Sequence, residues 1–208
     1  SWGIYVDDSF REGQRQIAVW AMYDGVEVRE NWGGGCVYIG QGGTTTQYFK
    51  DCNFKNFMGY GVYGNHAGGI SLIDCIVENS NSDESLSGAQ PYVFLDGCDH
   101  VLIEHCWFEA RNATPAGDFA NTPGAHEFIQ AAGTYDGLTI DSCRFVRNAG
   151  HNLKAIRIGG YGRSVEINNA AMVVAQYVPT PEVGNILIDG PVDTGQENQV
   201  VIVGGSLV

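Results

Sequence analysis

Apolar residues alternate with other residues in many short segments of the chain, as in CRF (143–145) and IRI (156–158). A period of two is typical of β-strands, because successive side chains point to opposite faces of a sheet. No segment shows the spacing of apolar residues that an amphipathic helix needs. The pattern therefore predicts an all-β protein built from many short strands.

One short phrase recurs at uneven intervals. Four copies contain a cysteine, and two more have Ala170 or Gly205 in its place; the copies are YFKDCNF (48–54), SLIDCIV (71–77), LIEHCWF (102–108), TIDSCRF (139–145), EINNAAM (166–172) and VIVGGSL (201–207). A fixed phrase with variable spacing indicates a constant stacked scaffold that carries variable loops.

The alternation breaks at the two residues before each cysteine, for example Lys50 and Asp51 before Cys52. Phe49 and Cys52 are both expected to face inward, so the two residues between them must form a bend. Asp and Asn suit such a bend, because they tolerate unusual backbone angles. A further strand precedes each copy, which gives three short strands per repeat; these strands are GCVYIG (35–40), GYGVYGN (59–65), PYVFLDG (91–97), EFIQAAG (127–133), KAIRIGG (154–160) and NILIDG (185–190).

This repeat resembles the right-handed parallel β-helix of the pectate-lyase-like superfamily, which includes bacteriophage tailspikes. The resemblance covers about residues 34–208 and implies a single all-β domain, a right-handed single-stranded parallel β-helix of about six coils. Each coil of that family consists of three strands, PB1, PB2 and PB3, which are followed by the turns T1, T2 and T3 respectively. The two-residue bends are similar to T2, and the variable loops are similar to T3. The strands that precede each copy of the phrase, such as PYVFLDG (91–97), are similar to PB1. Residues 1–33 fit the repeat poorly and are expected to form an irregular first coil or an N-terminal cap.

Charge and cysteine spacing exclude several classes of function. The chain has 24 acidic and 11 basic residues, a formal net charge of −13, so it repels phosphate backbones and no nucleic-acid partner is expected. No apolar run reaches the roughly 20 residues of a membrane span, so no membrane insertion is expected. The cysteines form no CxxC pair, and we expect a buried column of free thiols with no metal and no cofactor.

Outward positions on the PB1-type strands supply the candidate binding residues. If Val93 and Leu95 face inward, their neighbours face outward. If Ile129 faces inward, Phe128 and Gln130 face outward; the opposite parity would expose Glu127 instead. Trp107 follows the cysteine of its coil and is also expected to face outward, to bind sugar or to pack against another subunit. The candidate carbohydrate-binding residues are Tyr92, Phe94, Trp107, His126, Phe128 and Arg157.

A catalytic pair would need two carboxylates about 5 Å apart for retaining or about 6.5–9.5 Å apart for inverting glycoside hydrolysis. Asp96 and Glu127 lie on neighbouring coils and could reach such a distance if Glu127 faces outward. The plainer role of Asp96 is to form a turn before Gly97. Two long polar loops on successive coils, 78–90 and 109–125, are expected to form a wall beside the PB1 face.

Three functions remain open at this point. The first is a tailspike or tail-fibre module that binds host-surface polysaccharide as a homotrimer, outside the cell on the tail of a virion. The second is a polysaccharide lyase or glycoside hydrolase on the same fold, a depolymerase. The third is a structural spacer. Because the chain starts at Ser1 without an initiator methionine, we also expect it to be a fragment of a longer protein.

Overall fold

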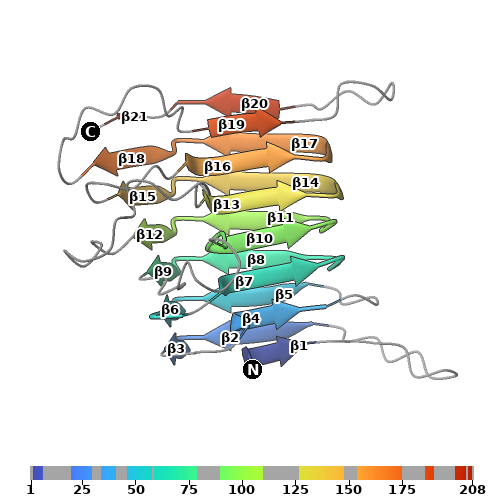
Figure 1. Cartoon of the computed structure of the whole chain (residues 1–208), viewed down its shortest axis with the longest axis vertical. Coiled ribbons are helices and arrows are strands. Elements are labelled where there is room, and N and C mark those ends of the chain that lie inside the picture. The colour runs from blue at the N-terminus through green and yellow to red at the C-terminus, as the bar shows by residue number, and fades with distance from the viewer. Residues whose placement is uncertain are drawn as a thin grey trace, which may run out of the picture.

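The computed structural model (Figure 1) is built from β-strands, and the residues it describes contain no helix. None of these residues therefore belongs to a helix long and apolar enough to cross a bilayer. The structure describes residues 2–6, 20–29, 34–40, 46–57, 59–78, 90–109, 127–147, 154–174, 186–189, 200–204 and 206–207.

Within the described residues, the strands form three sheets of seven strands each. Sheet 1 contains β1 (Trp2–Val6), β4 (Gly35–Ile39), β7 (Tyr60–Asn65), β10 (Val93–Asp96), β13 (Glu127–Ala132), β16 (Lys154–Gly159) and β19 (Ile186–Asp189). Sheet 2 contains β2 (Ala21–Asp24), β5 (Gln47–Lys50), β8 (Ile70–Ile73), β11 (Val101–Glu104), β14 (Thr134–Asp141), β17 (Tyr161–Asn168) and β20 (Val200–Val203). Sheet 3 contains β3 (Glu27–Arg29), β6 (Asn53–Lys55), β9 (Ile76–Glu78), β12 (Trp107–Glu109), β15 (Arg144–Arg147), β18 (Ala171–Val174) and β21 (Ser206–Leu207).

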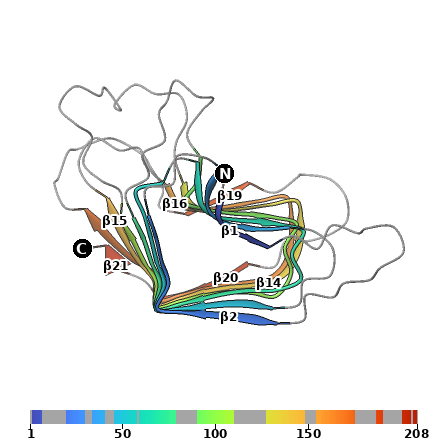
Figure 2. The same ribbon diagram turned by 90° about the horizontal axis from the view of Figure 1, so that it is seen from below.

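Each strand pairs in parallel with the strand three places later in the chain, as β4 does with β7 and β7 with β10. The chain therefore passes through the three sheets in turn and rises by one strand in each (Figure 1). Seen end-on, sheets 1 and 2 face each other and sheet 3 closes one side (Figure 2). This arrangement fits a parallel β-helix and confirms the prediction of an all-β protein. Strands β1, β2 and β3, from the first 33 residues, begin the three sheets.

The repeated cysteines are buried and free, as predicted. Each thiol donates a hydrogen bond to a backbone carbonyl of the preceding repeat: Cys75 Sγ lies 3.4 Å from the oxygen of Phe49, and Cys106 Sγ lies 3.3 Å from that of Leu72. Cys143 Sγ makes the same contact, at 3.4 Å, with Ile103. The small thiol thus fills the narrow interior beside the bend, and it also gives a hydrogen bond to a buried backbone carbonyl there.

The residue before each cysteine adopts the left-handed backbone conformation, with φ of 52° at Asp51 and 53° at Asp74. His105, Ser142 and Asn169 take the same conformation at the same place in later repeats. The bend amides continue the parallel ladder, since Asp51 N donates to Ile73 O at 3.0 Å and Asp74 N to Glu104 O at 3.1 Å. The predicted two-residue bend is therefore confirmed, and the cost of its left-handed residue is offset by regular hydrogen bonds.

The interior is filled by inward columns of apolar side chains, one residue from each repeat. In sheet 2 the residues three places before the cysteine position, Phe49, Leu72, Ile103, Ile140 and Ile167, lie directly opposite one another and are fully buried. Burial of such columns on all three sheets supplies the main stabilisation of the stack. The fold thereby holds the outer faces of its sheets rigid.

Two of the expected outward residues face the interior instead. Tyr92 is 3% exposed and Phe128 is fully buried, and their rings meet edge to face with centroids 5.0 Å apart. Each directly precedes an inward residue of sheet 1, Val93 or Ile129, so two consecutive side chains are buried where the chain enters this sheet. The outward orientation predicted for Tyr92 and Phe128 is wrong, because strict alternation does not extend into the corner.

Candidate functional site

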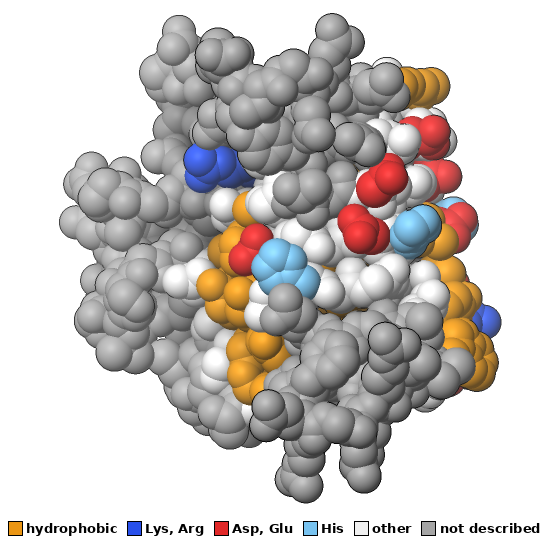
Figure 3. All heavy atoms as spheres, turned by 90° about the vertical axis from the view of Figure 1, so that its right-hand side faces the viewer, with side chains coloured by type: hydrophobic (Ala, Val, Ile, Leu, Met, Phe, Trp, Pro, Cys, Tyr) orange, Lys and Arg blue, Asp and Glu red, His pale blue; other side chains and the backbone are white. Residues whose placement is uncertain are grey.

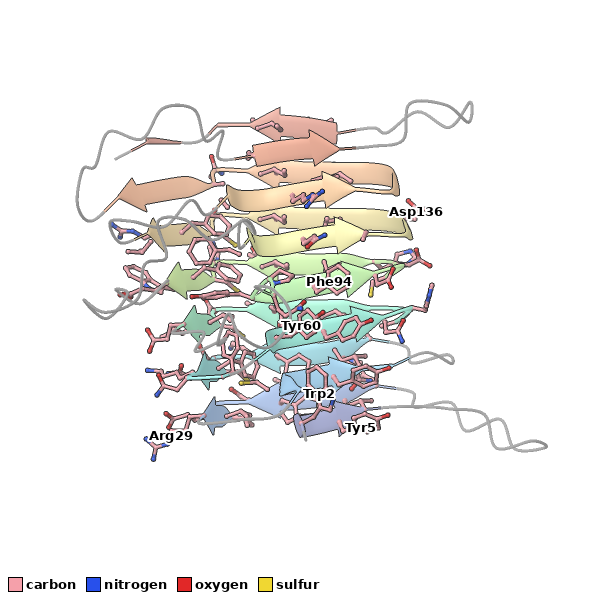
Figure 4. All side chains as sticks on the ribbon, viewed as in Figure 1. Trp2, Tyr5, Arg29, Tyr60, Phe94 and Asp136 are labelled. Atoms are coloured by element: carbon pink, nitrogen blue, oxygen red, sulfur yellow. The ribbon has the colours of Figure 1, made fainter. Side chains whose placement is uncertain are left out.

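The outer face of sheet 1 carries a column of aromatic side chains, one from each of four neighbouring strands. Tyr5, Tyr38, Tyr63 and Phe94 lie directly opposite one another in register. Their successive ring centroids are 4.8, 5.5 and 5.3 Å apart. Trp2 and Tyr60 lie beside this column, and we call the six residues together the ring ladder. Figure 4 shows its labelled members, Trp2, Tyr5, Tyr60 and Phe94, on the strands of sheet 1.

The alternation of β-strands places these rings outward. Val37, Val62 and Val93 are fully buried, and the residue after each of them, Tyr38, Tyr63 or Phe94, is half-buried on the outer face. Since parallel strands are about 4.8 Å apart, rings at equivalent positions come into contact. Tyr5 is the most open member, with 59% of its surface exposed.

Trp2 and Tyr60 widen the column on one side. Trp2 packs at centroid distances of 5.3 Å from Tyr38, 6.3 Å from Tyr60 and 6.2 Å from Tyr63. Its indole lies over Gly34 and Gly35, where a Cβ would come within 2.6 Å of the ring. Tyr60 stacks on Phe94 at 5.7 Å, with an angle of 15° between the rings. The absence of side chains at the two glycines thus makes room for a ring that spans three strands.

Polar groups border the ring ladder. Asn65 Nδ2 donates a hydrogen bond to the Tyr38 hydroxyl at 3.1 Å. Burial raises the pKa of the Tyr60 and Tyr63 phenols, and the Asp96 carboxylate raises both further. These phenols are therefore protonated at neutral pH and able to donate hydrogen bonds. The site combines flat apolar surfaces with hydroxyl, amide and carboxylate groups.

The column continues past Phe94 with polar residues. Phe94 lies opposite Gln130, and Gln130 lies opposite Arg157. Both side chains are half-buried between fully or nearly fully buried neighbours, so both project from the outer face. Phe94 and Arg157 were predicted to face outward, and the structure places them in one column with the tyrosines.

Asp96 and Glu127 are not brought together. Asp96 lies opposite Ala132 at the end of β13, whereas Glu127 is the first residue of that strand. Five residues of extended chain therefore separate their backbone positions by about 16 Å along the strand. Asp96 does stand at a turn, since Gly97 follows it with φ of 61°.

The corner between sheets 1 and 2 gathers titratable residues from three repeats, and Figure 3 views the molecule from this side. Asp136 N donates to Asp99 Oδ1 at 3.0 Å, and His100 N donates to Asp136 O at 2.7 Å. The His66 ring lies over Gly97, where a Cβ would come within 2.5 Å of its Nδ1. Among the described residues no group of His, Cys, Asp and Glu has the geometry to hold a metal ion.

Trp107 lies on sheet 3, away from the ring ladder. Its indole Nε1 donates to Glu109 Oε2 at 3.0 Å, and the Arg144 guanidinium lies 5.0 Å from the centre of its ring. The side chain is half-buried, and one face and its only hydrogen-bond donor are already engaged. His126 and most of the two long loops, residues 79–89 and 110–126, lie outside the described residues.

Five members of the ring ladder were not predicted from the sequence: Trp2, Tyr5, Tyr38, Tyr60 and Tyr63. A signal for two of them was present, because the strands GCVYIG and GYGVYGN each contain a tyrosine directly after the inward valine. Alignment of Val37, Val62 and Val93 would have placed Tyr38 and Tyr63 beside Phe94. Trp2 could not be found this way, because its strand lies in the segment that fits the repeat poorly.

Comparison with known proteins gives no relative from which function could be transferred. No protein-family model matches the chain, and neither curated proteins nor solved structures include a match to it. The ring ladder on the outer face of sheet 1 is therefore the feature from which a function is inferred.

Proposed function

We propose that this chain is a polysaccharide-binding module whose binding surface is the ring ladder. The observation that carries the proposal is the column of four rings, Tyr5, Tyr38, Tyr63 and Phe94, on a sheet face that is partly open to solvent. Exposed apolar surface on a rigid scaffold is costly unless a partner covers it.

A pyranose ring fits this surface chemically. The flat face of a tyrosine or phenylalanine matches the apolar C–H face of a sugar, while hydroxyl and amide groups at the rim match its hydroxyls. The Tyr38 hydroxyl with Asn65, the phenols of Tyr60 and Tyr63, and the Asp96 carboxylate provide that rim. The spacing of about 4.8 Å between rungs is similar to the length of one sugar unit in an extended glycan.

As part of the same proposal, the fold is the right-handed parallel β-helix of the pectate-lyase-like superfamily, with the module in the role of a tailspike that recognises host-surface polysaccharide. Parallel strands joined across one sheet are connected in the right-handed sense in nearly all proteins, which supports this handedness. The module would act as a homotrimer outside the cell. Light scattering in solution tests the trimer, and the mass of a single chain would contradict it.

The experiment that tests the binding function is a glycan array probed with the wild-type chain and with Tyr63→Ala. Loss of one central ring is expected to weaken binding about tenfold or more, equivalent to ~1.4 kcal/mol. The matched control is Tyr48→Ala, because Tyr48 is a half-buried tyrosine on the outer face of sheet 2. Equal losses for the two variants, or no binding by the wild type to any glycan, would contradict the proposal.

A further inference from the structure

The ring ladder and its polar continuation differ in charge. Tyr63 and Phe94 lie near Asp96, whose negative charge raises the pKa of Tyr60 and Tyr63. Arg157 stands two strands further along the same column. The column thus runs from an aromatic part beside a carboxylate to a part that carries a cation.

We propose that the ligand is a linear glycan which lies along the stack, with neutral sugars on the ring ladder and an acid-bearing sugar at Arg157. This inference rests on the proposed function and names the substrate class for the same site. Asp96 disfavours an anion on the aromatic part, whereas Arg157 pairs with a carboxylate or sulfate through two parallel hydrogen bonds. The two residues together therefore fix the direction of the glycan on the sheet.

The geometry matches such a ligand. Arg157 lies two strands beyond Phe94, about 10 Å away along the stack, with Gln130 between them. This is close to the length of two sugar units, so the acidic group would fall on the second sugar after the one stacked on Phe94. The amide of Gln130 offers both a donor and an acceptor to the hydroxyls of the intervening sugar.

The overall charge limits how acidic the ligand is. With a formal net charge of −13, the chain repels a polymer that carries a negative charge on every unit. A glycan with isolated acidic units among neutral ones avoids most of this repulsion and still reaches Arg157. The inference is therefore specific for a sparsely charged glycan.

The test uses an array of linear oligosaccharides in which each carboxyl-bearing member is printed beside its carboxyl-reduced form. The wild type is expected to prefer the acidic member of its best pair by about tenfold, and added salt should reduce this preference. Arg157→Gln should abolish the preference for the acidic member. Arg144→Gln, which alters an exposed arginine on sheet 3, should retain the preference.

The outcomes separate this inference from the proposed function. If the wild type binds both forms of every pair equally, or if Arg157→Gln keeps the preference, the acidic subsite is wrong and the binding function stands. If the wild type binds no member, both fail. Arg157→Lys provides a second variant, which should keep part of the preference because it retains the charge and loses the paired hydrogen bonds. Thermal melts of all variants establish that each is folded.

Discussion

The carbonyl oxygen of Gly133 lies where a side chain at Gly160 would begin, because a Cβ on Gly160 would be only 2.2 Å from it. Gly160 also has φ of 74°, a conformation that other residues adopt at a cost. Gly160→Ala should therefore lower the free energy of unfolding by about 2–3 kcal/mol, which urea denaturation would measure. An unchanged midpoint would show that the two repeats are not packed as described.

Gly25 provides the matched control for that substitution. It also has a positive φ, of 64°, and a Cβ there would meet nothing within 4 Å. It occupies the bend position that Asn169 fills in a later repeat with φ of 50°. Gly25→Asn should therefore change the free energy of unfolding by less than about 1 kcal/mol.

The six free cysteines should be protected from reagents in the folded protein. All of them are buried, and burial raises the pKa of Cys36 and Cys98 to about 12. At pH 8 these two thiols are fully protonated, and only the thiolate reacts quickly. Ellman's reagent should label none of the six in the native chain and all six in guanidinium chloride. Rapid labelling of the native chain would contradict the buried column.

The same thiols predict how stability depends on alkaline pH. The ordinary pKa of 9.0 applies to the unfolded chain, and the raised value of about 12 applies to Cys36 in the folded chain. Because the unfolded state loses its protons first, the stabilisation is complete below pH 9 and declines as the pH rises from about 9 to 12. Unfolding measured across this range should show the decline, and Cys36→Ala should reduce it.

Removal of the Trp2 ring should loosen the edge of sheet 1. Trp2 contacts three tyrosines and covers two glycines, so its loss uncovers apolar surface on β4 and β7. Trp2→Ala is expected to cost about 1–2 kcal/mol and to increase hydrogen exchange in β1 and β4. Trp2→Phe should recover part of the loss. Unchanged hydrogen exchange in β4 after Trp2→Ala would contradict the stabilisation of this sheet edge by the Trp2 ring.

The repeated phrase made the architecture predictable. The phrase places a small residue between a polar bend and apolar neighbours, at Cys52, Cys75, Cys106 and Cys143. Equivalent positions in successive repeats of a stack lie over one another, so these residues are expected to form one column. The inward column of sheet 2 and the left-handed bend follow from that one alignment. The structure adds the register of the paired strands, which places equivalent residues of successive repeats directly opposite one another.

The positions where strands begin were harder to predict. A period of two assigns alternate faces inside a strand, and it does not state at which residue the corner ends. Tyr92 and Phe128 stand at that point and turn into the interior, where Phe57, Phe108 and Phe145 surround them. The pairing of Asp96 with Glu127 matched neighbouring strands without their register, and the register places Asp96 opposite Ala132.

The thiol column also bears on how faithfully the chain folds. If a repeat docked one residue out of step, Asp74 would enter the interior at the place of Cys75, and its carboxylate would lose water without gaining a partner. Such burial costs several kcal/mol, far more than the thiol gains from its own hydrogen bond. Each polar bend beside a small buried residue therefore disfavours a shifted register between neighbouring repeats of the stack.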